Sequence, residues 1–201
     1  FHNYLYEKFG LDFLYKAMTT DDIEAAIGGV RALGIRGCSV SMPFKQAVIP
    51  LVNEVDHSAE VIGAVNTIVN AEGYLHAYNT DVIAVASLLT THSVDPNLPF
   101  LLRGSGGMAR AVAGAFFDAG FKQGTIIARN KDAGQDLAQK YGYKWAPEVG
   151  ELTAPVIVNV TPIGMEGGVE EDSLAYPQAS IDAAQVVFDV VAMPVETPLI
   201  R

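Results

Sequence analysis

The sequence predicts an α/β protein in two parts, the second of which is a parallel sheet with helices on both faces. From residue 100 onward, short apolar runs alternate with helical segments, the pattern of strands joined by crossover helices. Before residue 82, apolar runs at 64–69 and 74–78 flank the turn sequence Asn-Ala-Glu-Gly, which indicates a hairpin. We therefore expect a first domain at 1–81, a linking helix and bridge at 82–99, and a second domain at 100–201.

In the first part, hydrophobic spacing and turn residues predict several elements ahead of the hairpin. Thr20-Asp21-Asp22 is a capping signal for a helix that ends at Gly34, and Pro43 stops a strand before a helix that begins near Phe44. The expected helices lie at 4–9, at 23–34 and from residue 44, and the expected strands lie at 14–17 and 37–41.

In the second part, apolar runs of strand length alternate with helical patterns, and Gly120 ends the first of these helices. The expected strands are 100–102, 125–128, 155–160 and 186–191, and the expected helices are 108–119 and 132–141.

Composition excludes several classes of protein. Half of the 201 residues are apolar, which is enough for a hydrophobic core, yet no apolar run approaches the ~18 residues of a membrane span. We therefore expect a cytoplasmic protein with no membrane partner. Cys38 is the single cysteine, and no Cys and His cluster has metal-ligand spacing, so we expect neither a disulfide nor a metal site. Because the chain starts at Phe1 and stops at Arg201 after an apolar stretch, we expect a fragment.

The formal net charge is −10, from 13 basic and 23 acidic residues, and the basic residues form no block. A nucleic-acid partner is therefore not expected, because such proteins concentrate positive charge along one surface. If this acidic chain binds an anion, its few cations must gather at the binding site.

A glycine-rich segment marks a nucleotide site. Gly104-Ser105-Gly106-Gly107-Met108-Ala109 fits G-x-G-x-x-A, directly after an expected strand and at the start of an expected helix. Gly104 allows the turn, Gly106 lets backbone approach a pyrophosphate, and Ala109 allows close helix packing. The second part is therefore expected to be Rossmann-like. The alternative is a glycine-rich turn that binds no ligand.

The second strand of this part indicates which dinucleotide binds. Where NAD-binding members of the fold place an acidic residue, the strand at 125–128 runs into Arg129-Asn130-Lys131. A guanidinium pairs well with a phosphate, so Arg129 and Lys131 favour NADP as the cofactor, although both could be solvated loop charges.

Short polar residues at strand ends of the first part indicate a catalytic site. Oxidation of a secondary alcohol needs a group that accepts the hydroxyl proton, and a lysine can serve with a nearby aspartate to orient it. Lys45, delivered by the Pro43 turn just beyond Ser39 and Ser41, and Asp81 are the candidates.

Six strings occur in the order found in shikimate dehydrogenases, and the chain resembles that family over essentially its whole length. They are Ser-Val-Ser-Met-Pro-Phe-Lys, Gly-Ala-Val-Asn-Thr, Asn-Thr-Asp, Gly-Ser-Gly-Gly-Met-Ala-Arg, Asn-Val-Thr-Pro-Ile-Gly-Met and Asp-Val-Val-Ala-Met-Pro-Val-Glu-Thr-Pro-Leu. The resemblance implies an N-terminal α/β substrate-binding domain followed by the Rossmann-like NADP-binding domain. It also implies a reversible NADP-linked conversion of shikimate to 3-dehydroshikimate, a step toward aromatic amino acids.

The resemblance also assigns roles to residues. It implies that Lys45 is the acid/base and that Asp81 is hydrogen-bonded beside it. It further implies that a cyclic hydroxy acid contacts Ser41, Asn66 and Asn79, that residues 104–109 hold the pyrophosphate, and that Thr161 and Met193 line the nicotinamide side. A monomer or homodimer is expected.

Departures from the family pattern leave alternatives open. The family usually has Asn and Thr where this chain has Ser39 and Ser41, Gly where it has Val82, and an aromatic hydroxyl where it has Ala192. An apolar residue is usual at the position of Arg103. These changes resemble a shikimate dehydrogenase-like subgroup. The alternatives are a dehydrogenase of quinate or another hydroxylated cyclic acid, or an NADPH-binding regulatory module with little turnover. The family's first-strand serines and its C-terminal glutamine contact lie outside this sequence.

Overall fold

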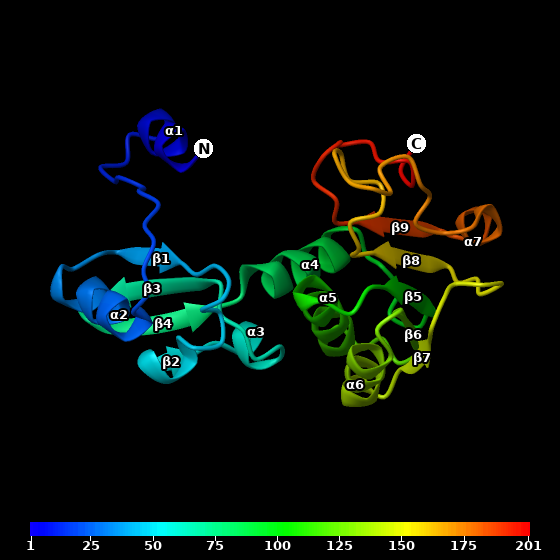
Figure 1. Ribbon diagram of the computed structural model, residues 1–201, viewed down its shortest axis with the longest axis horizontal. Helices are drawn as coiled ribbons and strands as arrows, with labels where there is room; N and C mark the ends of the chain where they lie inside the picture. The colour runs from blue at the N-terminus through cyan, green and yellow to red at the C-terminus, as the bar shows by residue number, and fades with distance from the viewer.

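The computed structural model describes all 201 residues and contains two β-sheets, one on each side of helix α4 (Thr80–Thr91) (Figure 1). We call the first sheet with its helices the first lobe, and the second sheet with its helices the second lobe. The first sheet has the order β1-β3-β4-β2, in which β2 runs parallel to β4 and the other neighbours are antiparallel. Its strands are β1 (Gly37–Ser39), β2 (Glu54–Val55), β3 (Thr67–Ala71) and β4 (Tyr74–Tyr78).

The second sheet is entirely parallel and has the order β7-β6-β5-β8-β9. The order reverses at β5, so the switch point of this sheet lies between β5 and β8, where α/β proteins bind ligands. This confirms the expected parallel, Rossmann-like sheet. Its strands are β5 (Phe100–Arg103), β6 (Gly124–Ile127), β7 (Lys144–Ala146), β8 (Val156–Asn159) and β9 (Val186–Asp189).

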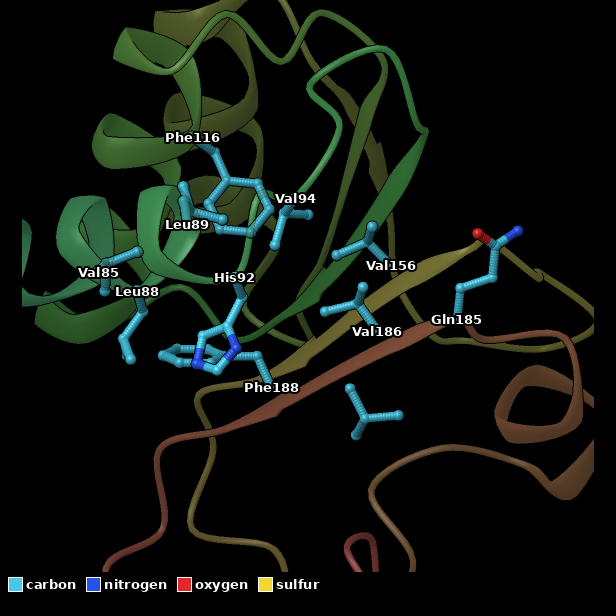
Figure 2. A pocket seen from close by; sticks show the side chains of 11 residues that line it. Val85, Leu88, Leu89, His92, Val94, Phe116, Val156, Gln185, Val186 and Phe188 are labelled. Atoms are coloured by element: carbon cyan, nitrogen blue, oxygen red, sulfur yellow. The ribbon is translucent and has the colours of Figure 1, made fainter.

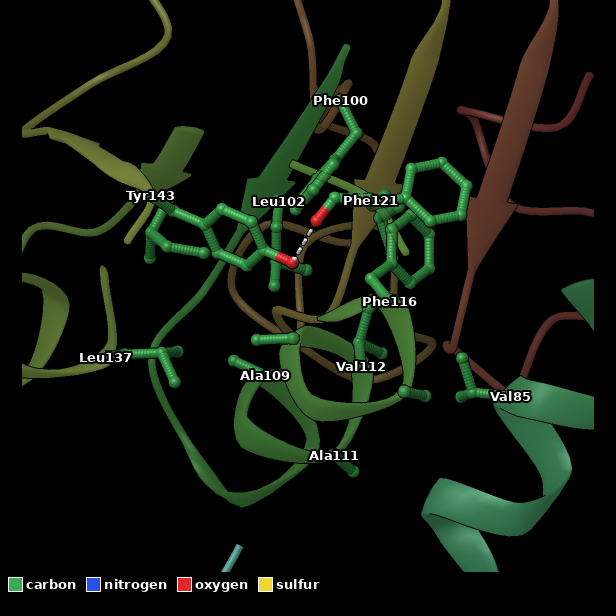
Figure 3. Close-up of a cluster of buried hydrophobic side chains, with 14 of the residues drawn as sticks. Val85, Phe100, Leu102, Ala109, Ala111, Val112, Phe116, Phe121, Leu137 and Tyr143 are labelled. Atoms are coloured by element: carbon green, nitrogen blue, oxygen red, sulfur yellow. Dashed lines mark hydrogen bonds between the residues drawn. The ribbon is translucent and has the colours of Figure 1, made fainter. Parts of the chain in front are cut away.

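The helices α5 (Gly107–Asp118) and α6 (Lys131–Tyr141) cover one face of the second sheet, and α4 packs beside α5. Figure 3 shows the core on this face, where Phe100 from the central strand meets Phe116, Phe121 and Tyr143. The Tyr143 hydroxyl donates a hydrogen bond of 3.0 Å to the Phe121 carbonyl. Residues 160–177, helix α7 (Gln178–Asp182) and Leu199 cover the opposite face. The second sheet is therefore buried on both sides, as a parallel sheet must be.

In the first lobe, helix α2 (Ile23–Ala32) packs Ile27 and Val30 against one face of the sheet. Asp22 caps this helix through a bond of 2.9 Å from the Ala25 amide, as the capping signal predicted. The buried Asn70 amide donates to the carbonyls at the end of the helix, 3.1 Å to Val30 and 2.9 Å to Ile35. The same face of the sheet carries short elements, the 3₁₀ helix η1 (Ile49–Leu51) and α3 (His57–Glu60).

Two expected elements of the first part are wrong. The strand at 14–17 is absent, because this segment follows α1 (His2–Lys8) and finds no neighbouring strand. Instead, the Tyr15 amide donates to Asn3 Oδ1 at 2.6 Å, and Asn3 Nδ2 donates to the Tyr15 carbonyl at 3.0 Å. The helix from Phe44 is a series of turns, since Pro50 lacks the amide that would extend it and the chain tightens into η1.

A segment of the first lobe, residues 57–63, contacts the second lobe directly. His57 Nε2 lies 3.0 Å from Asp118 Oδ2 at the end of α5, and the Tyr141 hydroxyl donates to the Val61 carbonyl at 3.0 Å. Lys140 donates to the same carbonyl. Burial raises the pKa of Tyr141 to about 12, so this hydroxyl keeps its proton and stays a donor at neutral pH. Together with α4, this contact holds the two lobes together.

None of the helices combines the length and hydropathy that crossing a bilayer requires. No group of three or more His, Cys, Asp or Glu side chains is gathered where it could hold a metal ion.

Gly114 of α5 is the tightest point of this lobe contact, and replacing it with alanine tests the packing. An added Cβ would lie 2.2 Å from Val61 Cγ1 and 3.1 Å from the Tyr141 hydroxyl. We expect Gly114→Ala to lower the free energy of unfolding by about 1–3 kcal/mol, the usual cost of overpacking. Urea denaturation followed by circular dichroism measures it.

Gly28→Ala is the matched control, because a Cβ at this helical position meets nothing within 4 Å. It should raise the free energy of unfolding by about 0.5–1 kcal/mol. A Gly114→Ala variant as stable as the parent would contradict the described contact.

Candidate active site

The glycine loop after β5 has a backbone conformation that only glycine adopts readily, and open space beside it. Gly104 has φ +133°, and a Cβ there would lie 2.6 Å from Val160 Cγ2, so a larger residue is excluded. At Gly106 and Gly107 a Cβ would meet nothing within 4 Å. The backbone there borders open space, which a phosphate can occupy.

Helix α5 leaves its N-terminus available to an anion. Its N-cap is Gly106, which has no side chain to bond the first amides, and no acidic residue lies in its first turn. These N–H groups and the helix dipole favour a phosphate group. Ala109 is fully buried in the core, which lets α5 approach the sheet, while Ser105 and Met108 are half-buried. These residues thus form a turn with open backbone at the start of a helix, and their binding of a pyrophosphate stays a prediction.

Arg129 and Lys131 are exposed directly after β6, and neither pairs with a carboxylate. Asn130 between them caps α6, accepting a bond of 3.1 Å from the Ala133 amide. Because β6 is parallel to β5, its carboxyl end lies at the same edge of the sheet as the glycine loop. Both cations are therefore free to meet an anion near that loop.

Arg103, the unusual residue before the glycine loop, has a structural partner. Its guanidinium donates to the Ala175 carbonyl, which ties the segment after β8 to the central strand. Burial lowers the pKa of Arg103, and Tyr176 and Glu170 oppose that shift.

Thr161 and Met193 belong to the loops that follow β8 and β9. The Thr161 hydroxyl donates to Asn159 Oδ1 at 2.6 Å, and its methyl carbon would be 3.5 Å from a Cβ on Gly104. The Met193 side chain is 58% exposed, and its carbonyl accepts a bond of 2.9 Å from Glu166. Thr161 therefore lies beside the glycine loop. The Met193 side chain is exposed, and its loop after β9 is bonded to the loop after β8 through Glu166.

In the first lobe, backbone bonds gather the expected catalytic segments. The Val40 amide donates to the Asn66 carbonyl at 2.8 Å, and the Val65 amide donates to the Lys45 carbonyl at 2.8 Å. Val40 is buried while Ser39 and Ser41 on either side are exposed, as the period of a strand requires. Ser41, Lys45 and Asn66 therefore come from segments that run side by side.

Asn66 is held by one end of its amide. Its Oδ1 accepts bonds from the Thr80 amide at 2.9 Å, the Thr80 hydroxyl at 3.2 Å and the Thr67 hydroxyl at 3.0 Å. Its Nδ2 donates to no protein group, so it can bind a ligand hydroxyl. The Thr80 contact also brings Asp81, the next residue, to this region.

Asn79 has both ends of its amide engaged within the protein. It caps α4, where its Oδ1 accepts from Asp81 at 3.1 Å and Val82 at 3.4 Å, and its Nδ2 donates to the Ala64 carbonyl at 2.9 Å. Ser58 Oγ accepts a bond of 3.0 Å from its backbone amide. The side chain is 1% exposed, so it fixes the start of α4 and presents no free group to a substrate.

Lys45 and Asp81 are both half-buried, and neither side chain forms a hydrogen bond or ion pair within the protein. The structure thus leaves the ammonium and the carboxylate free, and does not join them in the direct contact that the resemblance implied. Together with Asn66 Nδ2, they are polar groups without protein partners in one region.

Sequence reasoning missed several polar residues that organise these sites. Asn159 and Asp189 are the last residues of β8 and β9, and Ser58, Thr80 and Thr197 hold neighbouring groups by hydrogen bonds. The available signal was a polar residue at the carboxyl end of a buried parallel strand, where ligand sites of this fold lie.

An apolar hollow of about 450 Å³ lies between α4, α5 and strands β8 and β9, and none of these polar residues lines it (Figure 2). Leu88, Leu89 and Phe116 line one side, and Val186 and Phe188 line the other. His92 and Gln185 are its polar residues, and it holds no phosphate-binding cation. It does not suit a nucleotide or a polyhydroxylated acid.

The fold and the glycine-loop edge define an α/β protein of the dinucleotide-binding class. The family model described as the shikimate dehydrogenase substrate binding domain matches residues 1–68. The chain is 57% identical over 201 residues to a shikimate dehydrogenase-like protein of Haemophilus influenzae, covering 100% of this chain and 74% of the relative. The chain therefore belongs to the shikimate dehydrogenase family, as its motifs indicated.

Solved structures agree with this assignment. A structure of a shikimate 5-dehydrogenase-like protein matches with a TM-score of 0.97 at 56% identity, over 100% of this chain and 74% of the other. Shikimate 5-dehydrogenase from Thermus thermophilus, in complex with NADP(H) and shikimate, matches with a TM-score of 0.81 at 28% identity, over 100% and 76%. The two-lobed α/β fold with a Rossmann-like sheet is thus the family fold.

The engagement of Asn79 predicts a large effect on stability. Asn79→Ala removes the cap of α4 and leaves the Ala64 carbonyl without its partner, so we expect a loss of about 2–3 kcal/mol in the free energy of unfolding. Urea denaturation measures it. Asn130→Ala is the control, because it removes an exposed cap alone and should cost about 1 kcal/mol. Equal losses in the two variants would show that the buried contact of Asn79 adds nothing.

Proposed function

We propose that this chain forms the core of an NADP-dependent oxidoreductase that interconverts shikimate and 3-dehydroshikimate. The observation that carries the proposal is the group of free polar atoms in the first lobe. The Lys45 ammonium, the Asp81 carboxylate and Asn66 Nδ2 have no protein partners, although hydrogen bonds from Val65 to Lys45 and from Thr80 to Asn66 hold their segments together. Polar groups that a fold positions and leaves unpaired are suited to bind a polyhydroxylated substrate.

NADP, when bound, supplies the acceptor for the hydride that leaves the substrate carbon. In the direction of oxidation, the unprotonated amine of Lys45 accepts the proton of the reacting hydroxyl, and in reduction the ammonium returns it. Asn66 Nδ2 donates to a substrate hydroxyl oxygen, and Asp81 accepts a hydrogen bond from a second hydroxyl. Ser41, exposed at the same strand end, offers a further hydroxyl contact.

The second lobe would hold the cofactor at the carboxyl edge of its sheet. Residues 104–109 bind the pyrophosphate through exposed backbone amides, and Arg129 with Lys131 binds the 2′-phosphate. Asn79 acts by fixing the start of α4, and thus the position of Asp81.

Quinate or another hydroxylated cyclic acid is a second candidate substrate. Ala192 is an exposed methyl group on the β9 loop, where the family pattern has an aromatic hydroxyl. Removing a substrate contact relaxes the discrimination between related acids. Reduction of NADP⁺ with shikimate, with quinate and with neither acid distinguishes these possibilities, and NADPH binding without turnover of either acid would favour a regulatory module.

Lys45→Ala tests the proposed acid/base. We expect kcat with shikimate to fall by about 10²–10⁴, because the proton then has no positioned acceptor, while the Kd for NADPH stays unchanged. The appearance of NADPH absorbance measures the rate. Lys122→Ala is the control and should retain full activity, because Lys122 is an exposed lysine between α5 and β6. Undiminished turnover by Lys45→Ala would remove Lys45 from the mechanism.

Arg129→Ala tests the choice of cofactor. Loss of a charge-assisted bond to phosphate, about 1.5–3 kcal/mol, should raise the KM for NADP⁺ by about 10- to 100-fold and leave the KM for NAD⁺ nearly constant. Arg36→Ala, an exposed arginine of the first lobe, is the control. If both cofactors weaken equally, Arg129 contacts something other than the 2′-phosphate.

A further inference from the structure

We propose that Asp189, the last residue of β9, is a positioning residue that fixes the two loops on the nicotinamide side of the cofactor. The proposal rests on the proposed function, because it assumes that the cofactor binds beside these loops. Asp189 acts through Asn159 and Thr161 and does not touch the cofactor. It deepens the assignment of Thr161 and Met193.

The Asp189 carboxylate is bonded to three donors and to no cation. Oδ1 accepts from Asn159 Nδ2 at 3.0 Å and from the Val191 amide at 3.1 Å, while Oδ2 accepts from the Thr197 hydroxyl at 2.7 Å. Asn159 is fully buried and Thr197 is 1% exposed. The carboxylate thus joins the ends of β8 and β9 to the chain that returns at Thr197.

This carboxylate selects the orientation of the Asn159 amide. A carboxylate can only accept hydrogen bonds, so it faces Nδ2, and Nδ2 also lies 3.2 Å from the Ile163 carbonyl. Asn159 Oδ1 is then directed to Thr161, where it accepts from the amide at 3.1 Å and from the hydroxyl at 2.6 Å. In the opposite orientation, Asn159 Nδ2 would face the Thr161 amide, and two donors would meet.

The consequence for Thr161 is that its polar group faces the protein. The hydroxyl donates to Asn159 and accepts from the Ile163 amide at 3.3 Å. The methyl group is left beside Gly104, whose added Cβ would lie 3.5 Å from it. We infer that the cofactor meets an apolar contact at Thr161, which suits the face of a nicotinamide ring.

The same carboxylate anchors the loop after β9, residues 190–197, at both ends. Val191 and Thr197 bond to its two oxygens, and the Met193 carbonyl between them accepts from Glu166 of the first loop. Residues 190–197 are therefore held to residues 159–166 while the Met193 side chain remains exposed. Losing the carboxylate releases both loops at once.

Asp189→Ala is the test, with two measurements. In the cofactor-free protein, hydrogen exchange at the Thr161 and Val191 amides should accelerate. Val191 loses its acceptor, and the acceptor of Thr161, Asn159 Oδ1, loses the carboxylate that orients its amide. In a fluorescence titration the Kd for NADPH should rise by about tenfold or more, since displaced binding groups lose most of their contribution. Asp189→Asn should recover most of the affinity, because its Oδ1 can still accept from Asn159 and Val191.

Val156→Ala, at the opposite end of β8, is the control for a general loss of stability. It should destabilise the protein and leave the Kd for NADPH within about twofold of the parent, by the independence expected of distant sites. If Asp189→Ala behaves like Val156→Ala in either NADPH affinity or exchange at Thr161 and Val191, Asp189 is structural only and the proposal is overturned. If Asp189→Ala does not fold, Thr197→Val, which removes one of the three donors, is measured in its place.

The two proposals fail in different ways. A parent protein that binds no NADPH would refute the proposed function. Accelerated exchange at Thr161 and Val191 in Asp189→Ala would still support the positioning role, and unchanged exchange would refute it.

Discussion

The parallel hydrogen-bond ladder on both sides of β5 is the interaction on which the rest of this structure depends. Arg103 pairs in register with Ile127 of β6 and with Asn159 of β8, so the ends of three strands reach one edge together. The glycine loop, Arg129 and Thr161 each follow one of these ends. A slip of one residue in either pairing would turn these side chains to the other face of the sheet, and the glycine loop, Arg129 and Thr161 would no longer lie together.

Asn66 and Asn79 illustrate how burial decides what a polar residue does. Asn66 directly precedes β3 and Asn79 directly follows β4, so both lie at the same end of the hairpin, and both belong to motifs of the family. The Asn79 amide is enclosed and used at both ends, so it stabilises the start of α4. The Asn66 amide is held by its oxygen and leaves its nitrogen free, so it is suited to a ligand. Residue type alone does not separate these roles.

Much of the second lobe could be predicted because its buried parallel strands are continuous apolar runs and its helices are long enough to show a period. The glycine loop was predictable for a related reason, since its motif lies between a strand and a helix. The two-residue β2, the three-residue β7 and the short α3 show no period, and partners distant in sequence create them. The strand expected at 14–17 failed for the converse reason, because an apolar run becomes a strand only when a neighbour accepts its backbone bonds.

The sequence by itself determined the fold class, the family and the residue types available for chemistry, because these depend on local spacing and on ordered motifs. Tertiary structure decided which of those residues are free to act. It placed the Lys45 ammonium, Asn66 Nδ2 and the Asp81 carboxylate in one region without protein partners. It used Arg103, Asn79 and Asp189 to hold the chain. The reason is that a hydrogen-bonding group engaged with the protein is not available to a ligand, and engagement depends on contacts between residues far apart in the chain.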